Sequence, residues 1–371
     1  MLDELKRSKL LLRLQADISA AKSPLAVDCK RLERAIYLIR LGHVEAVRGD
    51  LEALRSKYRH SASASISAWL HLAEGMVEHF TRMAPQARDK FLRANVISSV
   101  GGLYELKALS AAWLAHIDYT QDQFESMVKY ATEALDSPRG SNDAATARAS
   151  LVLAQAWHFC DRLEQALPWY RKANRLASTI GDTATTSAVM HNMAWLRAQR
   201  LLAADCGLAP PPVAEDRHAL LSIESTQHLD SMIGSKVFTQ STSILHAYGL
   251  TLTKRFAEAL PIYAASIAGA VDAGLGSMHA EMLANQAWCH AQLGHASQAR
   301  EDSALAEARL GPVDHVDDRA LAHARLAQVF ESLGEGGRSR EHRSAAEKAF
   351  RAWQQLQSNA LAALGRAVVS A

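Results

Sequence analysis

The sequence predicts an all-α protein in which about eight helical hairpins stack into an elongated solenoid, with a capping helix at each end. Three observations predict this fold. Residues 280–308 read as two helices joined by a tight turn at Gly294-His295. The same pattern recurs forty residues earlier and forty residues later, and small side chains occupy matching positions in the copies. Each hairpin of such an array buries its apolar face only against its neighbours.

The small side chains form three columns. The tightest site of the first helix is assigned to Ala35, Gly75, Ala115, Ala154, Ala194, Ala247, Ala287 and Ala327. The second helices supply Val47, Ala87, Met127, Ala166, Ala219, Ala259, Ala299 and Ser339, followed by Leu54, Ala94, Ala134, Ala173, Thr226, Ser266, Ala306 and Ala346. The first column has spacings of 40 or 39 residues, except for one of 53. Gly42, Gly294 and Gly334 fall where a helix must end in a residue that accepts positive φ.

The array is expected to span residues 28–348. Residues 1–27 form an N-terminal capping helix, with partner docking or dimerisation as the alternative role, and residues 349–371 form a C-terminal capping helix. The extra residues of the fifth hairpin lie at 206–218, CGLAPPPVAEDRH. Three consecutive prolines cannot be helical, so this insertion predicts a loop, which is either a tolerated expansion or a partner contact.

Composition excludes several classes of function. Lys plus Arg is 41 and Asp plus Glu is 39, so nothing indicates a polyanion partner, and neither nucleic acid nor a membrane is expected. The N-terminal apolar run is too short and interrupted for a signal peptide or a membrane span. Cys29, Cys160, Cys206 and Cys289 lack metal-type spacing and read as reduced, which predicts a cytoplasmic protein.

Catalytic and metal-binding motifs are not expected either. The 16 histidines show no HxxxH pair and no Cys/His spacing on one helical face. The sequence has no Gly-rich phosphate loop, no GxSxG and no paired carboxylates in an apolar helix. We therefore expect a protein that is not an enzyme and that carries neither a metal nor a cofactor.

Two stretches carry a family resemblance. Residues 162–177, RLEQALPWYRKANRLA, and 255–268, RFAEALPIYAASIA, resemble tetratricopeptide (TPR) repeats, in which a small residue, a Gly-led turn, Ala, an aromatic residue and Ala recur at set positions. The resemblance covers about residues 28–348 and implies a right-handed superhelix of TPR-like hairpins. The forty-residue period is similar to the longer repeats of kinesin light chains, LGN-type polarity adaptors and bacterial signalling regulators.

The resemblance also implies a binding surface, because first helices line a concave groove in this family. The corresponding residues here are His79, Phe80, His116, Tyr119, Gln155, His158, Phe159, His191, Trp195, Gln199, Tyr248, Trp288, Gln292 and Gln328. Aromatic, amide and imidazole side chains with few charges suit an extended or helical peptide.

One sub-motif recurs within that surface. HNMAWLRAQ (191–199) and ANQAWCHAQ (284–292) place Asn192 and Asn285 where the kinesin and LGN type keeps asparagines that hold the ligand main chain. The asparagines either contact ligand or bridge adjacent helices. The tryptophans of the sub-motif either pack between hairpins or contact ligand. Arg325, in the same column, either meets a ligand carboxylate or is solvated.

These expectations favour a non-enzymatic interaction module that binds a peptide or helix of a partner protein in the groove, as a regulatory adaptor. The first alternative is a ligand-sensing or peptide-sensing regulator of a bacterial signalling pathway that acts on an effector in trans. The second is a secretion or assembly chaperone.

Overall fold

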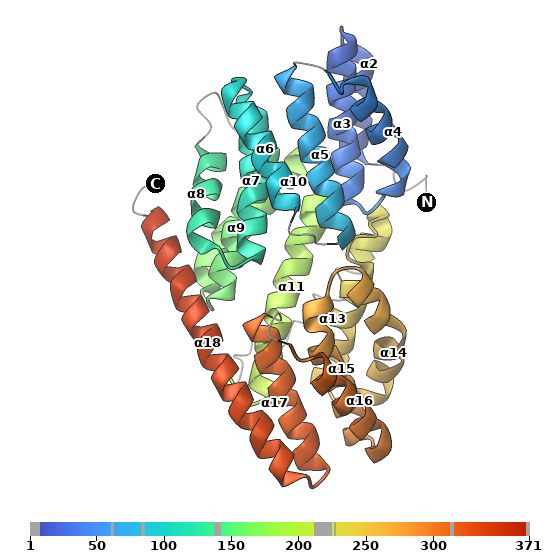
Figure 1. Cartoon of the computed structure of the whole chain (residues 1–371), viewed down its shortest axis with the longest axis vertical. Coiled ribbons are helices and arrows are strands. Elements are labelled where there is room, and N and C mark those ends of the chain that lie inside the picture. The colour runs from blue at the N-terminus through green and yellow to red at the C-terminus, as the bar shows by residue number, and fades with distance from the viewer. Residues whose placement is uncertain are drawn as a thin grey trace. The chain divides into compact units, whose positions relative to one another are not determined.

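Helices are the regular structure of this chain (Figure 1). The computed structural model describes residues 8–60, 63–82, 86–136, 142–210, 225, 228–311 and 315–368, and no β-strand occurs among them. The predicted all-α fold of helical hairpins is therefore confirmed. Residues 211–218 of the Pro-rich insertion, together with Ala219 and Thr226 of the small-residue columns, lie outside the described residues.

The chain divides into two compact units. Unit 1 consists of Met1–Met190, Leu229–Val237 and Asn359–Ala371, and unit 2 consists of His191–His228 and Phe238–Ser358. Two long helices, α11 (Thr183–Asp205) and α18 (Gly336–Val368), contribute residues to both units. Helix α18 is continuous across residues 348 and 349, where the sequence analysis placed the start of a capping helix.

Unit 1 begins with α2 (Lys9–Ala20) and continues as consecutive hairpins. These are α3 (Pro24–Arg40) with α4 (Glu45–Lys57), α5 (Ala64–Arg82) with α6 (Ala87–Val100), α7 (Tyr104–Thr120) with α8 (Phe124–Leu135), and α9 (Asp143–Phe159) with α10 (Leu163–Ile180). The first part of α11 follows.

Unit 2 takes up the rest of α11 and adds three further hairpins. These are α13 (Thr239–Leu252) with α14 (Phe256–Asp272), α15 (His279–Gln292) with α16 (Ala296–Arg309), and α17 (Val316–Ser332) with α18. The short 3-10 helix η2 (Gly276–Met278) leads into α15.

The predicted small-residue columns lie at the helix contacts. Every described member of the three columns is buried. Gly75 marks the closest approach in its hairpin, because a Cβ atom added there would lie 2.7 Å from Cε1 of Phe91 on α6. Small residues in this register therefore allow the paired helices to touch, as the repeat predicts.

Six hairpin turns of the described structure share one backbone motif. The N–H group of the residue after the turn donates to the carbonyl five residues earlier, over 2.8 to 3.0 Å, in the pairs His43–Leu38, Gln123–Asp118, Arg162–Trp157, Arg255–Leu250, His295–His290 and Glu335–Phe330. The preceding residue has φ between 57° and 83°, and is Gly42, Asp122, Asp161, Lys254, Gly294 or Gly334. The three predicted glycine turns are confirmed, and this is the Schellman way of ending a helix.

Non-local contacts in unit 1 join α3 to the start of α11. The Tyr37 hydroxyl on α3 lies 2.8 Å from the Thr183 hydroxyl on α11, and Arg40 forms an ion pair of 2.9 Å with Asp182. Helix α2 packs over this junction, where Leu10 and Leu14 form a buried cluster with Tyr37.

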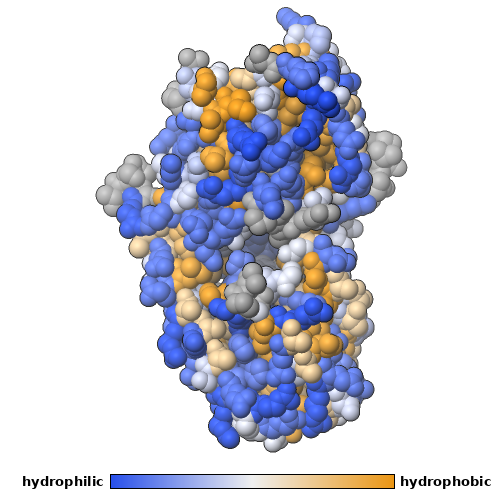
Figure 2. Space-filling view, in the orientation of Figure 1, coloured by the Kyte–Doolittle hydropathy of each residue, from blue (hydrophilic) through white to orange (hydrophobic). Residues whose placement is uncertain are grey.

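The surface has the mixed character expected of amphipathic helices. Figure 2 shows hydrophilic side chains over most of the visible face, with hydrophobic residues gathered in patches between them. Within the described ranges, none of the helices combines the length and apolarity that crossing a bilayer requires.

Candidate functional site

Two predicted binding residues of unit 2 bridge neighbouring helices. Arg325 on α17 has no exposed surface, and its Nε donates to Oδ1 of Asn285 on α15 over 3.0 Å. Asn285 is 2% exposed and donates its Nδ2 to the backbone carbonyl of Glu281 over 3.0 Å. Arg325 is also paired at 2.7 Å with Asp205 near the end of α11. The bridging role left open by the sequence is thus observed for Asn285, while contact with ligand stays a prediction.

The aromatic residues predicted in unit 2 pack beside these groups. The Arg325 guanidinium lies 5.5 Å from the ring centroid of Trp288, which is half-buried against the Ala287 cluster. Trp195 lies 6.1 Å from the ring of Tyr248, which has no exposed surface. Both tryptophans therefore take part in packing between hairpins.

The amides predicted in unit 2 occupy different environments. Gln199 is buried and its Nε2 lies 3.4 Å from Asp317 on α17. Asn192 is half-buried, whereas Gln292 is exposed. The structure therefore does not bring all the predicted polar groups of unit 2 to one open surface.

The residues predicted in unit 1 lie toward the C-terminal ends of α7 and α9. His158 is buried and its Nδ1 lies 3.2 Å from the Tyr170 hydroxyl, and Phe159 stacks on Phe124 at 6.0 Å. Gln155 is buried, while His116 and Tyr119 are half-buried.

A buried acid in unit 2 was missed by the sequence analysis. Glu281 has no exposed surface, and the polar groups that act on its carboxylate include the buried Tyr248 hydroxyl. Burial raises the pKa of this carboxyl well above its usual value, and the negative charge of Asp318 raises it further. Glu281 precedes Asn285 by four residues and shares its helical face, which is the signal that could have revealed it.

The pocket best suited to a ligand lies in unit 1 and has a volume of about 1130 Å3. Its walls come from the N-terminal halves of the first helices α3, α5, α7 and α9, and from α2. The lining residues include Arg13, Asp17, Leu25, Cys29, Lys30, Glu33, Ser65, Trp69, Tyr104, Glu105, Leu109, Asn142, Asp143 and Ala144. None of the residues predicted as binding residues lines it.

Polar contacts hold the pocket walls in place. Lys30 forms an ion pair of 2.8 Å with Glu33 and lies 3.9 Å from Asp17 on α2. Burial alone would lower the pKa of the Lys30 ammonium, but Glu33 and Asp17 outweigh burial and raise it. Asn142 accepts the Ala145 N–H over 3.0 Å as the N-cap of α9 and donates to the Glu105 carbonyl over 3.3 Å. The starts of α7 and α9 are thereby tied together.

The repeat register contains the signal that could have located this pocket. Leu25, Ser65, Glu105 and Ala144 occupy one column, ten residues before the tight site of each first helix, and all four line the pocket. Cys29, Trp69 and Leu109 occupy the next column, four residues later, and line it as well. The groove predicted in unit 1 lies just beyond the tight sites, which is about two to four helical turns too far along each helix to reach this pocket.

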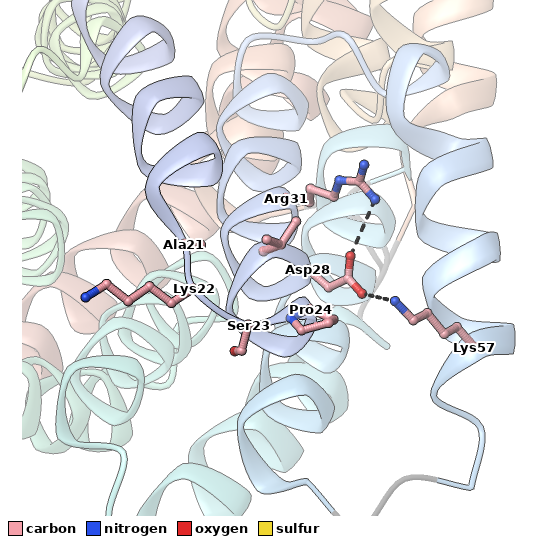
Figure 3. Close-up of a pocket in the computed structure, with 8 residues that line it drawn as sticks. Ala21, Lys22, Ser23, Pro24, Asp28, Arg31 and Lys57 are labelled. Carbon is pink, nitrogen blue, oxygen red and sulfur yellow. Dashed lines mark hydrogen bonds and ion pairs between the residues drawn. The ribbon is translucent and has the colours of Figure 1, made fainter.

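A smaller pocket of about 360 Å3 lies at the start of α3, beside the end of α4 (Figure 3). The acidic residue of its lining is Asp28, which accepts hydrogen bonds from Lys57 and Arg31 as drawn, and one of 2.8 Å from Tyr58. Burial alone would raise the pKa of Asp28, but Lys57 and Tyr58 outweigh it and hold the pKa below its usual value. These hydrogen bonds tie α3 to the end of α4, and they occupy the Asp28 carboxylate with groups of the protein itself.

In the part of the chain that the structure describes, no group of three or more His, Cys, Asp or Glu side chains is placed to hold a metal ion. The candidate site is therefore the larger pocket of unit 1, which offers aromatic, aliphatic and charged groups of both signs.

Comparison with known proteins supports the fold. No protein-family model matches the sequence, and no curated protein matches it. The chain is similar to the crystal structure of a Rap protein complexed with competence and sporulation factor, with a TM-score of 0.56 and 15% identity over 97% of this chain and 95% of that chain. It also matches the apo form of RapI, with a TM-score of 0.45 and 14% identity over 94% of this chain and 95% of that chain. The first likeness agrees with the all-helical repeat described above.

Proposed function

We propose that this protein is a non-enzymatic regulatory protein that binds a peptide in the large pocket of unit 1. The observation that carries the proposal is the pocket itself, since its volume of about 1130 Å3 exceeds what a small metabolite needs. Its walls combine Trp69 and Leu109 with charged groups such as Lys30 and Glu105, which can contact the side chains and the main chain of an extended peptide.

The comparison with a protein of similar fold suggests how this chain could act as a regulator. The Rap protein of similar fold is complexed with competence and sporulation factor. By analogy, we propose that this chain is a peptide-sensing regulator of a bacterial signalling pathway that acts on an effector in trans, and that its TPR-like hairpins supply the binding surface. Its free thiols at Cys29, Cys160, Cys206 and Cys289 favour a cytoplasmic site of action.

Two further sequence-based expectations stay as proposals. Asn192 and Gln292 in unit 2 are not fully buried, and we propose them as secondary contacts for a partner protein. Dimerisation through the terminal segments 1–27 and 349–371 is tested by light scattering of the purified chain across a concentration series.

Selection from a random 12-residue peptide library displayed on phage, with the full chain as bait, tests the function directly. We expect enriched sequences whose synthetic forms bind in calorimetry. Trp69→Ala should weaken binding at least about tenfold, because truncating a central aromatic contact typically costs more than 1 kcal/mol. Trp169→Ala is the matched control, since Trp169 is half-buried on the second helix α10 and does not line the pocket.

The proposal is wrong if no peptide is enriched over an empty support. It is also wrong if the enriched peptides bind the Trp69→Ala and Trp169→Ala variants equally well.

A further inference from the structure

Two arginines and one carboxylate lie together around Trp113 in the interior of unit 1. The guanidinium of Arg40, whose side chain is 10% exposed, lies 5.8 Å from the ring centroid of Trp113, and that of Arg148, a residue 5% exposed, lies 4.2 Å from it. The anion that acts on both arginines is Asp182, which is 2% exposed. Two arginines therefore lie near one buried carboxylate.

Asp182 is already fully engaged by other groups. Arg40 donates to its two carboxylate oxygens at 2.9 and 3.1 Å. The backbone N–H and the hydroxyl of Thr185 donate to the same two oxygens at 3.0 and 2.9 Å. This carboxylate consequently has no position left for Arg148.

Arg148 has no polar partner among the described residues. It makes no hydrogen bond or ion pair with any residue in the described ranges, and its buried Nε is unpartnered. Its guanidinium lies 4.2 Å from the ring centroid of Trp113. Cation–π attraction offsets only part of the cost of burying an unpaired charge, so Arg148 is poised to receive an anion.

Two imidazoles complete the environment of Arg148. His79 and His116 contact each other with ring centroids 5.1 Å apart, and both contact Trp113. Burial lowers the pKa of His79 to about 4 and that of His116 well below its usual value, so both rings are neutral at physiological pH. The buried Nδ1 of His116 has no partner in the described structure, and a neutral imidazole can donate a hydrogen bond to an anion.

The charge of Arg148 persists at neutral pH. Burial lowers the pKa of its guanidinium to about 9, and repulsion from Arg40 contributes to the decrease. A pKa of this size still leaves the side chain protonated at pH 7.

Arg148 does not itself line the pocket of unit 1, but it lies close to the lining residues in the repeat. Arg148 occupies the same repeat column as the pocket-lining residues Cys29, Trp69 and Leu109. On α9 it follows the lining residue Ala144 by four residues, and on α7 Trp113 follows the lining residue Leu109 by four. Residues four apart share a helical face, so Arg148 and Trp113 lie one turn deeper than the pocket walls.

We propose that Arg148 is the receptor for a carboxylate of the ligand that enters the unit 1 pocket. This inference rests on the proposed function and adds to it the chemical class of the ligand group that the protein recognises. A planar guanidinium stacked on an indole ring presents its remaining N–H groups to a planar carboxylate, and His116 is placed to add a donor. The carboxylate is either the C-terminus of a peptide or an Asp or Glu side chain.

Binding of matched peptides separates these two sources. Each library peptide is made with a free C-terminal carboxylate, as the C-terminal amide, and with its acidic residues changed to the corresponding amides. We expect one of the two neutralised forms to bind the wild-type chain about 10- to 100-fold more weakly, as for loss of a hydrogen bond to a buried charged group. In Arg148→Met, this difference between the acid and neutral forms should disappear. Arg148→Lys keeps the positive charge but loses the two parallel N–H donors of the guanidinium, so it should retain part of the difference in affinity between the acid and neutral peptides.

A second experiment, carried out without peptide, distinguishes this inference from the proposed function. Sodium acetate should raise the melting temperature of the wild-type chain more than sodium chloride of equal ionic strength, and Arg148→Met should abolish the excess. Arg171→Met is the control, because Arg171 is exposed on α10.

Each result decides between the possibilities. If peptides bind but their acid and neutral forms do not differ, or Arg148→Met preserves the difference, the inference is wrong while the proposed function stands. If no peptide binds, the function is wrong, and the acetate arm alone decides whether a carboxylate site exists. Stabilisation by inorganic phosphate but not by acetate would overturn the assignment to a carboxylate.

Discussion

Substitution of Gly75 by alanine should destabilise this protein although the same change stabilises most helices. Gly75 lies within α5, where alanine is normally favoured over glycine by about 1 kcal/mol. A Cβ atom at this position would lie 2.7 and 2.8 Å from two ring atoms of Phe91 and 3.1 Å from Cβ of Lys90. Phe91 has no exposed surface, so its ring cannot move into solvent.

The magnitude follows from two opposing contributions. Carbon atoms pack at about 3.5 to 4.0 Å, so the new methyl group must displace the ring by roughly 1 Å. Overpacking of this kind costs about 1 to 3 kcal/mol, which outweighs the helix propensity gained. We expect Gly75→Ala to lower the free energy of unfolding by up to about 2 kcal/mol.

The matched control is Gly49→Ala in α4. Gly49 is exposed, and nothing lies within 4 Å of a Cβ atom added there, so the same substitution should raise the free energy of unfolding by about 1 kcal/mol. Urea unfolding of the full chain, followed by far-UV circular dichroism, measures both variants.

A double variant isolates the contact. Adding Phe91→Leu to Gly75→Ala should cost less than the sum of the single changes, with a coupling of about 1 kcal/mol. Equal stabilisation by Gly75→Ala and Gly49→Ala would refute the assigned close contact between α5 and α6.

Two further substitutions test a hairpin turn of unit 2 and the ion pairs of a buried aspartate in unit 1. Lys254 has φ of 62° at the α13–α14 turn, so Lys254→Gly should raise the free energy of unfolding by about 1 kcal/mol, measured by urea unfolding. A destabilised variant would contradict the assigned backbone conformation. The folded-state pKa of Asp28 lies below its usual 3.8, so its ion pairs stabilise the protein above that pH and this contribution is lost as pH falls through the folded-state pKa. Asp28→Asn should therefore lower the melting temperature at pH 7, and the difference from wild type should begin to shrink below about pH 4 and vanish below the folded-state pKa; a constant offset across this range would exclude the ionised role.

The candidate site was only partly predictable from the sequence. The first helices were expected to carry the binding surface, and α3, α5, α7 and α9 do line the pocket. Trp69 and Leu109 were nevertheless missed, because the family resemblance placed the groove closer to the tight sites of the repeat. The sequence could not distinguish whether Asn285 is open to ligand or buried, since that depends on the neighbouring Arg325 reaching across from α17.

The sequence by itself determined the helical hairpins and their register. Ala154 and Ala287 predict close helix contacts, and Gly294 predicts a turn. These predictions hold because hairpin geometry depends on side-chain size and backbone conformation within one repeat. Only the tertiary structure decided that Arg40 pairs with Asp182 and that Arg148 has no hydrogen-bond partner in the described part of the chain. Such contacts join helices that are distant in the chain, and they depend on how small differences in packing accumulate from one hairpin to the next, which no single repeat encodes.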